Sequence, residues 1–141
     1  MAIYFVQDRI IFPAPNIAVE GFEDEIFEQV AITTPDREKL FALHHPSKNQ
    51  EATILVFHGN GDAAIFQKEK GAFLAEQGFG VLLVEYRGYP GSSGEPSETG
   101  LFIDGQAAYD FIINQKPQRV GLYAHSPVSY THLTLPTIYS V

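Results

Sequence analysis

The chain contains no cysteine and no run of basic residues. Without cysteine it has no disulfide, no thiolate metal ligand and no cysteine nucleophile. Lysine and arginine number 9 against 17 acidic residues, and the net charge of −8 argues against a nucleic-acid partner, whose phosphates require clustered cations. Long apolar runs are also missing, since the apolar start at 1–6 is far shorter than the roughly 20 residues of a membrane-spanning helix. We expect a cytoplasmic protein, or a membrane-associated one if an anchor precedes Met1.

What the chain does contain is material for one folded domain, with 141 residues that are 45% hydrophobic and 13% aromatic. The apolar runs 52–57, 81–84 and 120–123 lack polar alternation, which is typical of strands buried on both faces of a parallel sheet. Segments 26–33 and 40–45, separated by a turn at 34–37, indicate an antiparallel hairpin. The sequence predicts an α/β fold, with a lead-in hairpin followed by three parallel strands and two crossover helices.

The two predicted helices lie between the apolar runs. Asp62 is the expected N-cap of the first helix, and Gly78 lies just past its end. Its inner side is expected to carry Ile65, Ala72, Phe73 and Ala75. The second helix places Leu101, Gly105, Ala108 and Ile112 on one stripe facing the sheet. Asp104 and Asp110 of this helix are expected to be surface carboxylates.

Two strand ends carry the residues with candidate chemistry. Ser126 follows the run 120–123, and His58-Gly59-Asn60-Gly61 follows the run 52–57. A serine hydrolase needs an activated nucleophile and backbone N–H groups that stabilise an oxyanion. We therefore assign Ser126 as the candidate catalytic residue, and Gly59 with the N–H of Asn60 as the candidate oxyanion hole. An ordinary glycine turn and a serine that merely ends a strand are the structural alternatives.

The sequence also suggests three other interpretations. The segment 59–64 matches G-x-G-x-x-A, and Glu85 follows the next strand, so a dinucleotide-binding module is an alternative. A non-catalytic interaction domain is another. The pair His44-His45 is unlike a metal site, because neighbouring residues on a strand point to opposite faces. We expect no metal and no cofactor.

Several segments in series resemble the α/β-hydrolases. They are the loop 58–61, the segment Glu85-Tyr86-Arg87-Gly88 with its continuation to Gly94, and the stretch that leads through Asp104 to Asp110. Together with the opening 7–13 they resemble the serine-aminopeptidase-like branch, related to the bud-emergence family of membrane-associated hydrolases. The resemblance covers about residues 4–126. It implies the N-terminal half of the fold, a small-molecule acyl substrate, Ser126 as nucleophile and an oxyanion loop around Gly59 and Asn60. It also implies a downstream Asp and His, which have no counterpart in this sequence.

The residues around and after Ser126 depart from that pattern. The family's turn is Gly-x-Ser-x-Gly, whereas Ala124 and Val128 occupy the two glycine positions here. Pro127 has no N–H, so one oxyanion donor is lost. Residues 127–141 contain no charged residue and resemble translated adaptor sequence. We therefore expect a partial hydrolase domain at 1–126 followed by a non-native tail at 127–141, no activity in this truncated form, and self-association through an exposed edge of the last parallel strand.

Overall fold

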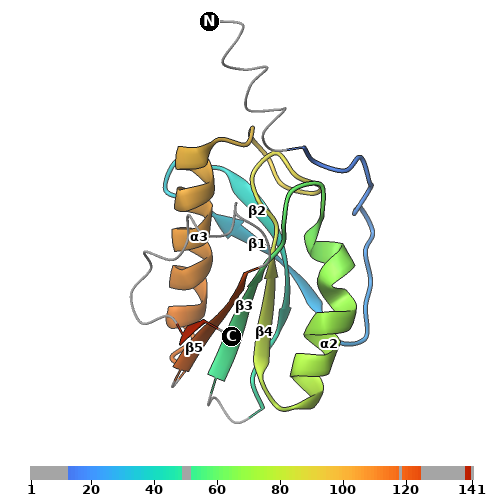
Figure 1. Cartoon of the computed structure of the whole chain (residues 1–141), viewed down its shortest axis with the longest axis vertical. Helices are drawn as coiled ribbons and strands as arrows, with labels where there is room; N and C mark the ends of the chain where they lie inside the picture. The colour runs from blue at the N-terminus through green and yellow to red at the C-terminus, as the bar shows by residue number, and fades with distance from the viewer. Residues whose placement is uncertain (1–12, 49–51, 118, 125–138, 141) are drawn as a thin grey trace, which may run out of the picture.

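The computed structural model describes residues 13–48, 52–117 and 119–124, together with the backbone of residues 139–140. Its centre is one six-stranded mixed sheet with the strand order β1-β2-β4-β3-β5-β6 (Figure 1). The strands are β1 (Glu28–Thr33), β2 (Lys39–His45), β3 (Ala52–Phe57), β4 (Gly80–Val84), β5 (Arg119–Ala124) and β6 (Tyr139–Ser140). The helices are the 3₁₀ turn η1 (Ala64–Gln67), α2 (Lys68–Glu76) and α3 (Glu98–Ile113).

The lead-in hairpin and the parallel strands form as the sequence predicts. β1 and β2 pair antiparallel from Glu28 opposite His44 to Thr33 opposite Lys39. β3 lies between β4 and β5 and is parallel to both. Every residue of β4 is buried, and so is every residue of β3 except Ala52, because helices cover both faces of the sheet. The continuous apolar runs therefore correspond to strands that contact side chains on both sides.

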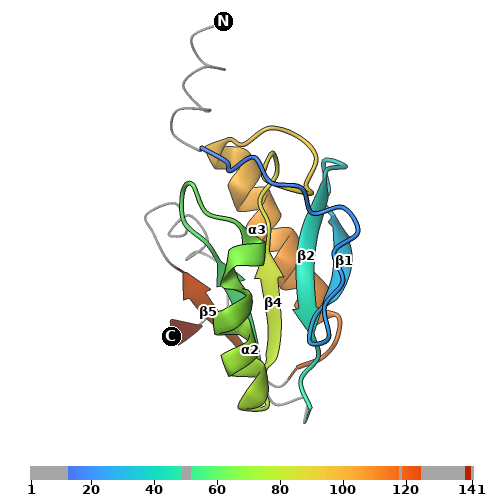
Figure 2. The ribbon, with the colours of Figure 1, turned by 90° about the vertical axis from the view of Figure 1, so that its right-hand side faces the viewer.

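The two helices lie on opposite faces of the sheet (Figures 1 and 2). The predicted inner stripe of α3 is confirmed, since Leu101, Gly105, Ala108 and Ile112 are all buried. The helix begins at Ser97, whose Oγ accepts the N–H of Gly100 at 3.0 Å. This hydroxyl satisfies one of the backbone donors that a helix N-terminus leaves without a partner.

The start of the first helix differs from the prediction. The chain enters through the 3₁₀ turn η1, whose N-cap is Ala63, and the carboxylate of Asp62 accepts the N–H of Ala63 at 2.8 Å. Asp62 therefore holds the entry turn and does not cap an α-helix. The end of α2 is as predicted: Gly78 has φ +95°, and the N–H groups of Gly78 and Phe79 return to the carbonyls of Ala75 and Leu74.

The inner face of α2 is only partly as predicted. Ala75 is buried and Ile65 and Ala72 pack at the edge of the core, but Phe73 is 63% exposed, so its assignment to the inner side was wrong. Gly71 occupies the point of closest approach instead. A Cβ at Gly71 would lie 2.8 Å from Cζ of Phe27, so the absence of a side chain lets the helix lie close to its neighbours. The surface through which α2 contacts the core is therefore narrower than the positions of its apolar residues predict.

The far edge of β5 is paired over a short length. β6 runs parallel to β5 and pairs with Gly121 and Leu122 only. Residues 127–138 and 141 lie outside the described part of the chain, so the expected division at residue 126 stays a prediction. No described helix combines the length and apolar character needed to cross a bilayer.

Candidate active site

The loop after β3 makes a tight turn at one end of the sheet. The N–H of Asp62 reaches the carbonyl of Gly59 at 3.3 Å, and the N–H of Gly61 donates to the carbonyl of Pro13 at 2.9 Å. Gly61 adopts φ +71°, a left-handed conformation that a side chain would disfavour. Gly59 is buried, whereas Asn60 and Gly61 are exposed. The turn therefore places Asn60 on the outside, between the buried Gly59 and Gly61, whose N–H is bonded to Pro13.

The register of β3 and β5 relates this turn to the candidate nucleophile. Phe57 pairs with Ala124 in a parallel ladder, and each residue is the last of its strand. Gly59 and Ser126 each follow two residues later. Ser126 itself lies outside the described residues, as do His125, Pro127 and Val128. The two strand ends that lead to the predicted site are neighbours at one edge of the sheet.

A buried histidine and a buried glutamate lie directly beneath the turn. His58 Nε2 contacts a carboxylate oxygen of Glu85, with the two side chains 0% and 1% exposed. His58 Nδ1 donates to the carbonyl of Gly59 at 2.8 Å. Burial lowers the pKa of His58, but the hydrogen bond and negative charge of Glu85 outweigh it and raise the pKa above its ordinary value.

The register of the parallel strands brings His58 and Glu85 together. Phe57 of β3 pairs with Val84 of β4, and His58 and Glu85 are the next residue on each strand. The carboxyl ends of adjacent parallel strands lie at the same edge, so two polar residues in these positions meet. The sequence carries this signal, since one polar residue directly follows each of the apolar runs 52–57 and 81–84.

Two tyrosines enclose the pair. The Tyr86 ring lies 4.8 Å from the His58 ring, and its hydroxyl donates to the His58 carbonyl at 3.2 Å. The Tyr89 ring lies 5.2 Å from His58, and burial together with the charge of Glu85 raises the pKa of Tyr89 to about 12. In the part of the chain that the structure describes, the buried Tyr89 hydroxyl has no hydrogen-bond partner. Both rings pack against His58, which contributes to its complete burial.

Arg87 connects the loop after β4 to the rest of the fold. Its guanidinium donates to both oxygens of Asp36, at 2.7 and 3.0 Å, and to Asp104, at 2.9 Å from Nε. The Arg87 backbone N–H donates to the second oxygen of Asp104 at 2.9 Å. Asp104 is 0% exposed, so the prediction of a surface carboxylate was wrong; Asp110 is exposed as predicted. Asp104 is buried because Arg87 supplies charge and donors for both of its oxygens.

Two serines of the same loop bind the edge of β2. Ser92 Oγ accepts the N–H of Phe41 at 2.9 Å, and Ser93 Oγ accepts the N–H of Lys39 at 2.8 Å. Gly91 lies so close to Val19 that a Cβ at position 91 would be 2.5 Å from the Val19 side chain. The segment 85–94 is therefore a rigid support beside the turn 58–64, at the same end of the molecule (Figure 1).

The geometry disfavours the dinucleotide interpretation. In that scheme Glu85 would bind a ribose hydroxyl. Both of its carboxylate oxygens instead accept backbone N–H groups, from Tyr86 at 3.0 Å and from Ala64 at 2.8 Å, and the residue is 1% exposed. Glu85 is buried and its oxygens are bound to N–H groups of the protein, so it does not present a carboxylate to a ribose hydroxyl.

The two neighbouring histidines of β2 point to opposite faces, as predicted. The His44 ring contacts Phe111 at 5.7 Å, whereas the His45 ring contacts Phe27 at 6.2 Å. Burial lowers the pKa of His44 below its ordinary value. Among residues 13–48, 52–117 and 119–124, no three histidine or acidic side chains are grouped so that they could hold a metal ion.

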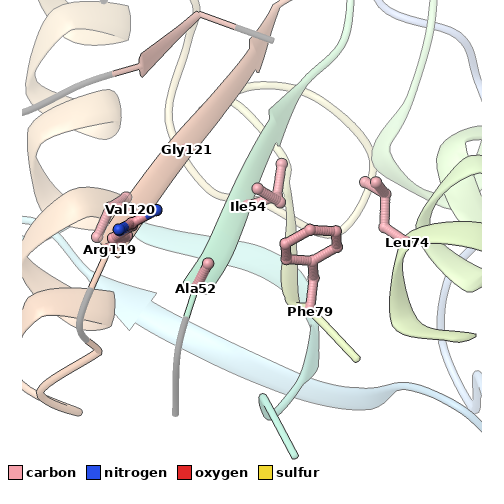
Figure 3. Close-up of a pocket in the computed structure, with 7 residues that line it drawn as sticks. All are labelled: Ala52, Ile54, Leu74, Phe79, Arg119, Val120 and Gly121. Atoms are coloured by element: carbon pink, nitrogen blue, oxygen red, sulfur yellow. The ribbon is translucent and has the colours of Figure 1, made fainter. Parts of the chain in front are cut away.

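One hollow in the described part of the chain lies away from this site. It measures about 500 Å³ and is lined by residues of β3, β5 and α2 and by Phe79, which precedes β4, as Figure 3 shows. Ala52 and Arg119, the first residues of β3 and β5, are among them, so the hollow lies at the amino ends of the strands. The turn 58–64 and the approach to Ser126 are at the carboxyl ends. The hollow is therefore not part of the candidate active site.

Comparison with known proteins gives relatives that are longer than this chain. YfhR of Escherichia coli K12, an uncharacterised protein, is 30% identical over 142 residues, which cover 88% of this chain and 50% of that protein. The protein bem46 of Schizosaccharomyces pombe is 32% identical over 122 residues, 79% of this chain and 41% of that protein. An uncharacterised membrane protein of Saccharomyces cerevisiae is 29% identical over 109 residues, 72% of this chain and 38% of that protein. The chain spans half or less of the length of these curated relatives, and no family model matches it.

Solved hydrolases share the fold. The esterase Pf2001 of Pyrococcus furiosus superimposes with a TM-score of 0.70 at 21% identity, covering 90% of this chain and 51% of that chain. An epoxide hydrolase of Vigna radiata superimposes with a TM-score of 0.67 at 16% identity, covering 82% and 37%. At these identities the likeness shows the fold alone. It confirms the predicted hairpin, parallel strands and two crossover helices as one half of the fold of these enzymes.

Proposed function

We propose that this chain belongs to the α/β-hydrolase superfamily and carries the nucleophile strand and the oxyanion loop of a serine hydrolase. The substrate class is an ester, amide or thioester. The observation that carries the proposal is the pairing of Phe57 with Ala124, which puts the exposed turn at Asn60 beside the strand that leads to Ser126. The similarity to bem46 agrees with the bud-emergence branch.

In the proposed chemistry, Ser126 Oγ attacks the carbonyl carbon of the substrate and loses its proton to a general base that no described residue supplies. The carbonyl oxygen becomes an oxyanion, which the backbone N–H of Asn60 stabilises from the loop that Gly59 begins. Collapse of this intermediate, with return of the proton from the general base to the leaving group, releases the alcohol, amine or thiol and leaves an acyl-serine. Water then hydrolyses the acyl-serine to the carboxylic acid and the free serine. No bound metal or organic cofactor takes part in these steps.

We further propose that the 141-residue chain does not complete this chemistry. The residue after the nucleophile normally provides a second oxyanion N–H, and Pro127 has none. Loss of one such donor costs about 2.7–4 kcal/mol of transition-state stabilisation. Proline also disfavours the helical region for the residue before it, which opposes a sharp strand-to-helix turn at Ser126.

A fluorophosphonate probe tests this second proposal directly. We expect no stoichiometric labelling of the purified chain, as measured by intact-mass spectrometry and peptide mapping. A Ser126→Ala variant is the control for reaction at other hydroxyls. One label per chain that disappears in Ser126→Ala would show that Pro127 does not prevent activation of the serine.

We propose that copies of the chain associate through the edge of β5, because β6 pairs with only two of its residues. The expected result is a mass that rises with protein concentration in multi-angle light scattering. A monodisperse monomer over the whole accessible concentration range would overturn this proposal.

Membrane association is a separate proposal. It rests on the yeast relative, which is described as a membrane protein.

A further inference from the structure

We propose that His58 and Glu85 form a buried imidazolium–carboxylate pair that positions the Gly59–Asn60 peptide, with its carbonyl inward and its N–H toward the site. Both would be positioning residues, since neither is exposed to a substrate. The inference deepens the proposed oxyanion role of this loop and rests on it. It concerns how the loop is held, which the sequence motif alone does not explain.

The protonation state follows from the acceptors that surround the pair. The Gly59 carbonyl carries no proton, so His58 Nδ1 must donate to it across 2.8 Å. The two Glu85 oxygens accept N–H groups from Tyr86 and Ala64, which is the pattern of an ionised carboxylate. His58 Nε2 must therefore donate to Glu85 as well. Both ring nitrogens carry protons, and the histidine is charged.

The charged groups around the ring agree with this state. Glu85 follows β4 and Asp62 lies in the turn itself; both raise the pKa of His58, against the opposing effect of burial. Among the described residues, the rings of Tyr86 and Tyr89 also contact His58, and they bring no positive charge. A buried charge needs such compensation, because desolvation alone would drive the ring to its neutral form.

The direction of the Asn60 N–H follows from peptide geometry. The described peptide bonds include no cis bond, and in a trans peptide the C=O and N–H groups point in opposite directions. The Gly59 carbonyl points inward, where it accepts from His58 Nδ1. The Asn60 N–H of the same peptide therefore points away from His58, toward the exposed side of the turn. Rotation of this peptide would remove the donor from the site.

Glu85 holds the turn at both ends. One oxygen contacts His58, which holds Gly59, and the other accepts the N–H of Ala64 at 2.8 Å. The exposed residues 60–61 lie between these two attachments. A single carboxylate on the neighbouring strand thus fixes the start and the end of the loop, which explains why an acidic residue follows β4.

Nuclear magnetic resonance of the ¹⁵N-labelled chain tests the pair without requiring catalysis. At about pH 8 most histidines are neutral, and we expect His58 to show two protonated ring nitrogens while His44 shows one. A neutral His58 at that pH would overturn the proposal. This measurement needs no substitution, so it stands even if a variant fails to fold.

Glu85→Gln removes the charge and keeps the shape of the side chain. We expect His58 to become neutral at neutral pH. We also expect the amide exchange of Asp62 and Ala64, whose N–H groups donate to Gly59 and Glu85, to accelerate by about tenfold or more. Glu76→Gln, at an exposed position on α2, is the matched control and should change neither. Unchanged ring signals and exchange rates in Glu85→Gln would contradict the positioning role.

The positioning role of His58 and Glu85 and the hydrolase role of Ser126 can be tested separately. If the ring and exchange results are as expected but Ser126 reacts under no condition, the pair positions the loop and the loop is not an oxyanion site. If Ser126 reacts with a phosphonate while His58 is neutral, the hydrolase proposal survives and the positioning inference fails.

Discussion

Replacement of Arg87 by leucine is expected to lower the free energy of unfolding by about 3–5 kcal/mol, because it leaves a buried charge without its partner. Asp104 is 0% exposed, and Arg87 supplies its counter-charge and a side-chain donor. Of its contacts with Arg87, only the backbone N–H would remain. Urea unfolding at neutral pH measures the loss, which is large for a domain whose total stability is about 5–15 kcal/mol.

Three further variants distinguish the effect of the buried Asp104 charge from that of the exposed Arg87–Asp36 pair. Asp36 is 41% exposed, so Asp36→Asn should cost no more than about 1 kcal/mol. Arg87→Leu combined with Asp104→Asn removes the uncompensated charge and should restore part of the lost stability. Leu101→Ala, at a buried apolar position on the same helix, shows what simple loss of packing costs. Equal losses in Arg87→Leu with and without Asp104→Asn would contradict the argument.

The free energy of unfolding of the Arg87→Leu variant should depend on pH. Burial raises the pKa of Asp104, and Arg87 opposes that rise. Without Arg87 the pKa rises further, so the folded state binds a proton more tightly than the unfolded state. Its stability then increases as the pH falls toward the pKa of an unfolded aspartate, and the penalty of Arg87→Leu should be smaller at about pH 4 than at neutral pH.

The fold was predictable because its strands need little beyond apolar runs. Segments 52–57 and 81–84 become strands buried on both faces, and no other local signal competes with them. The placement of Asp104 was predictable in part. It lies three residues after Leu101 and four before Ala108, on the buried stripe of α3. Helical periodicity alone would have put it inside, and only its residue type argued for the surface.

Other features depend on contacts that a pattern cannot supply. The hydrophobicity of Phe73 predicts a place on the inner face of α2. Gly71 instead lies close to Phe27, so only a narrow face of the helix is buried and Phe73 stays exposed. The partner of Arg87 at Asp36 comes from the hairpin turn, 51 residues away in the sequence. Such pairings arise from the way the strands assemble, so the sequence shows the two residues without showing that they meet.

The loops that follow β3 and β4 form one connected unit. His58 and Glu85 join them at the level of the sheet, and Arg87 ties the second loop to α3 and to the hairpin. The same residues therefore contribute to the stability of the fold and to the proposed chemistry. A substitution in the segment 85–94 should alter the turn at Asn60 even though it touches no substrate, which is why activity and unfolding must be measured together.

The largest effect on reactivity is expected from restoring the residue after Ser126. Pro127→Ala returns a backbone N–H, and Val128→Gly returns the glycine of the family's turn. The double variant should react with a fluorophosphonate about 10²–10³ times faster than the parent chain, which is the effect of one oxyanion donor. Both proteins can be slow in absolute terms, because the comparison is between their rates and not with an intact enzyme.

Two controls decide what an increase in rate means. Pro136→Ala removes the other proline of residues 127–141 and should leave the rate unchanged, which separates the oxyanion donor from a general effect of proline. Adding Ser126→Ala to the double variant should abolish the reaction, because the hydroxyl that forms the covalent bond is gone. If Pro127→Ala with Val128→Gly reacts no faster than Pro136→Ala, the position after Ser126 is not an oxyanion donor. The sequence after β5 would then be unrelated to the family's nucleophile turn, and the exposed turn at Asn60 would have lost its proposed partner.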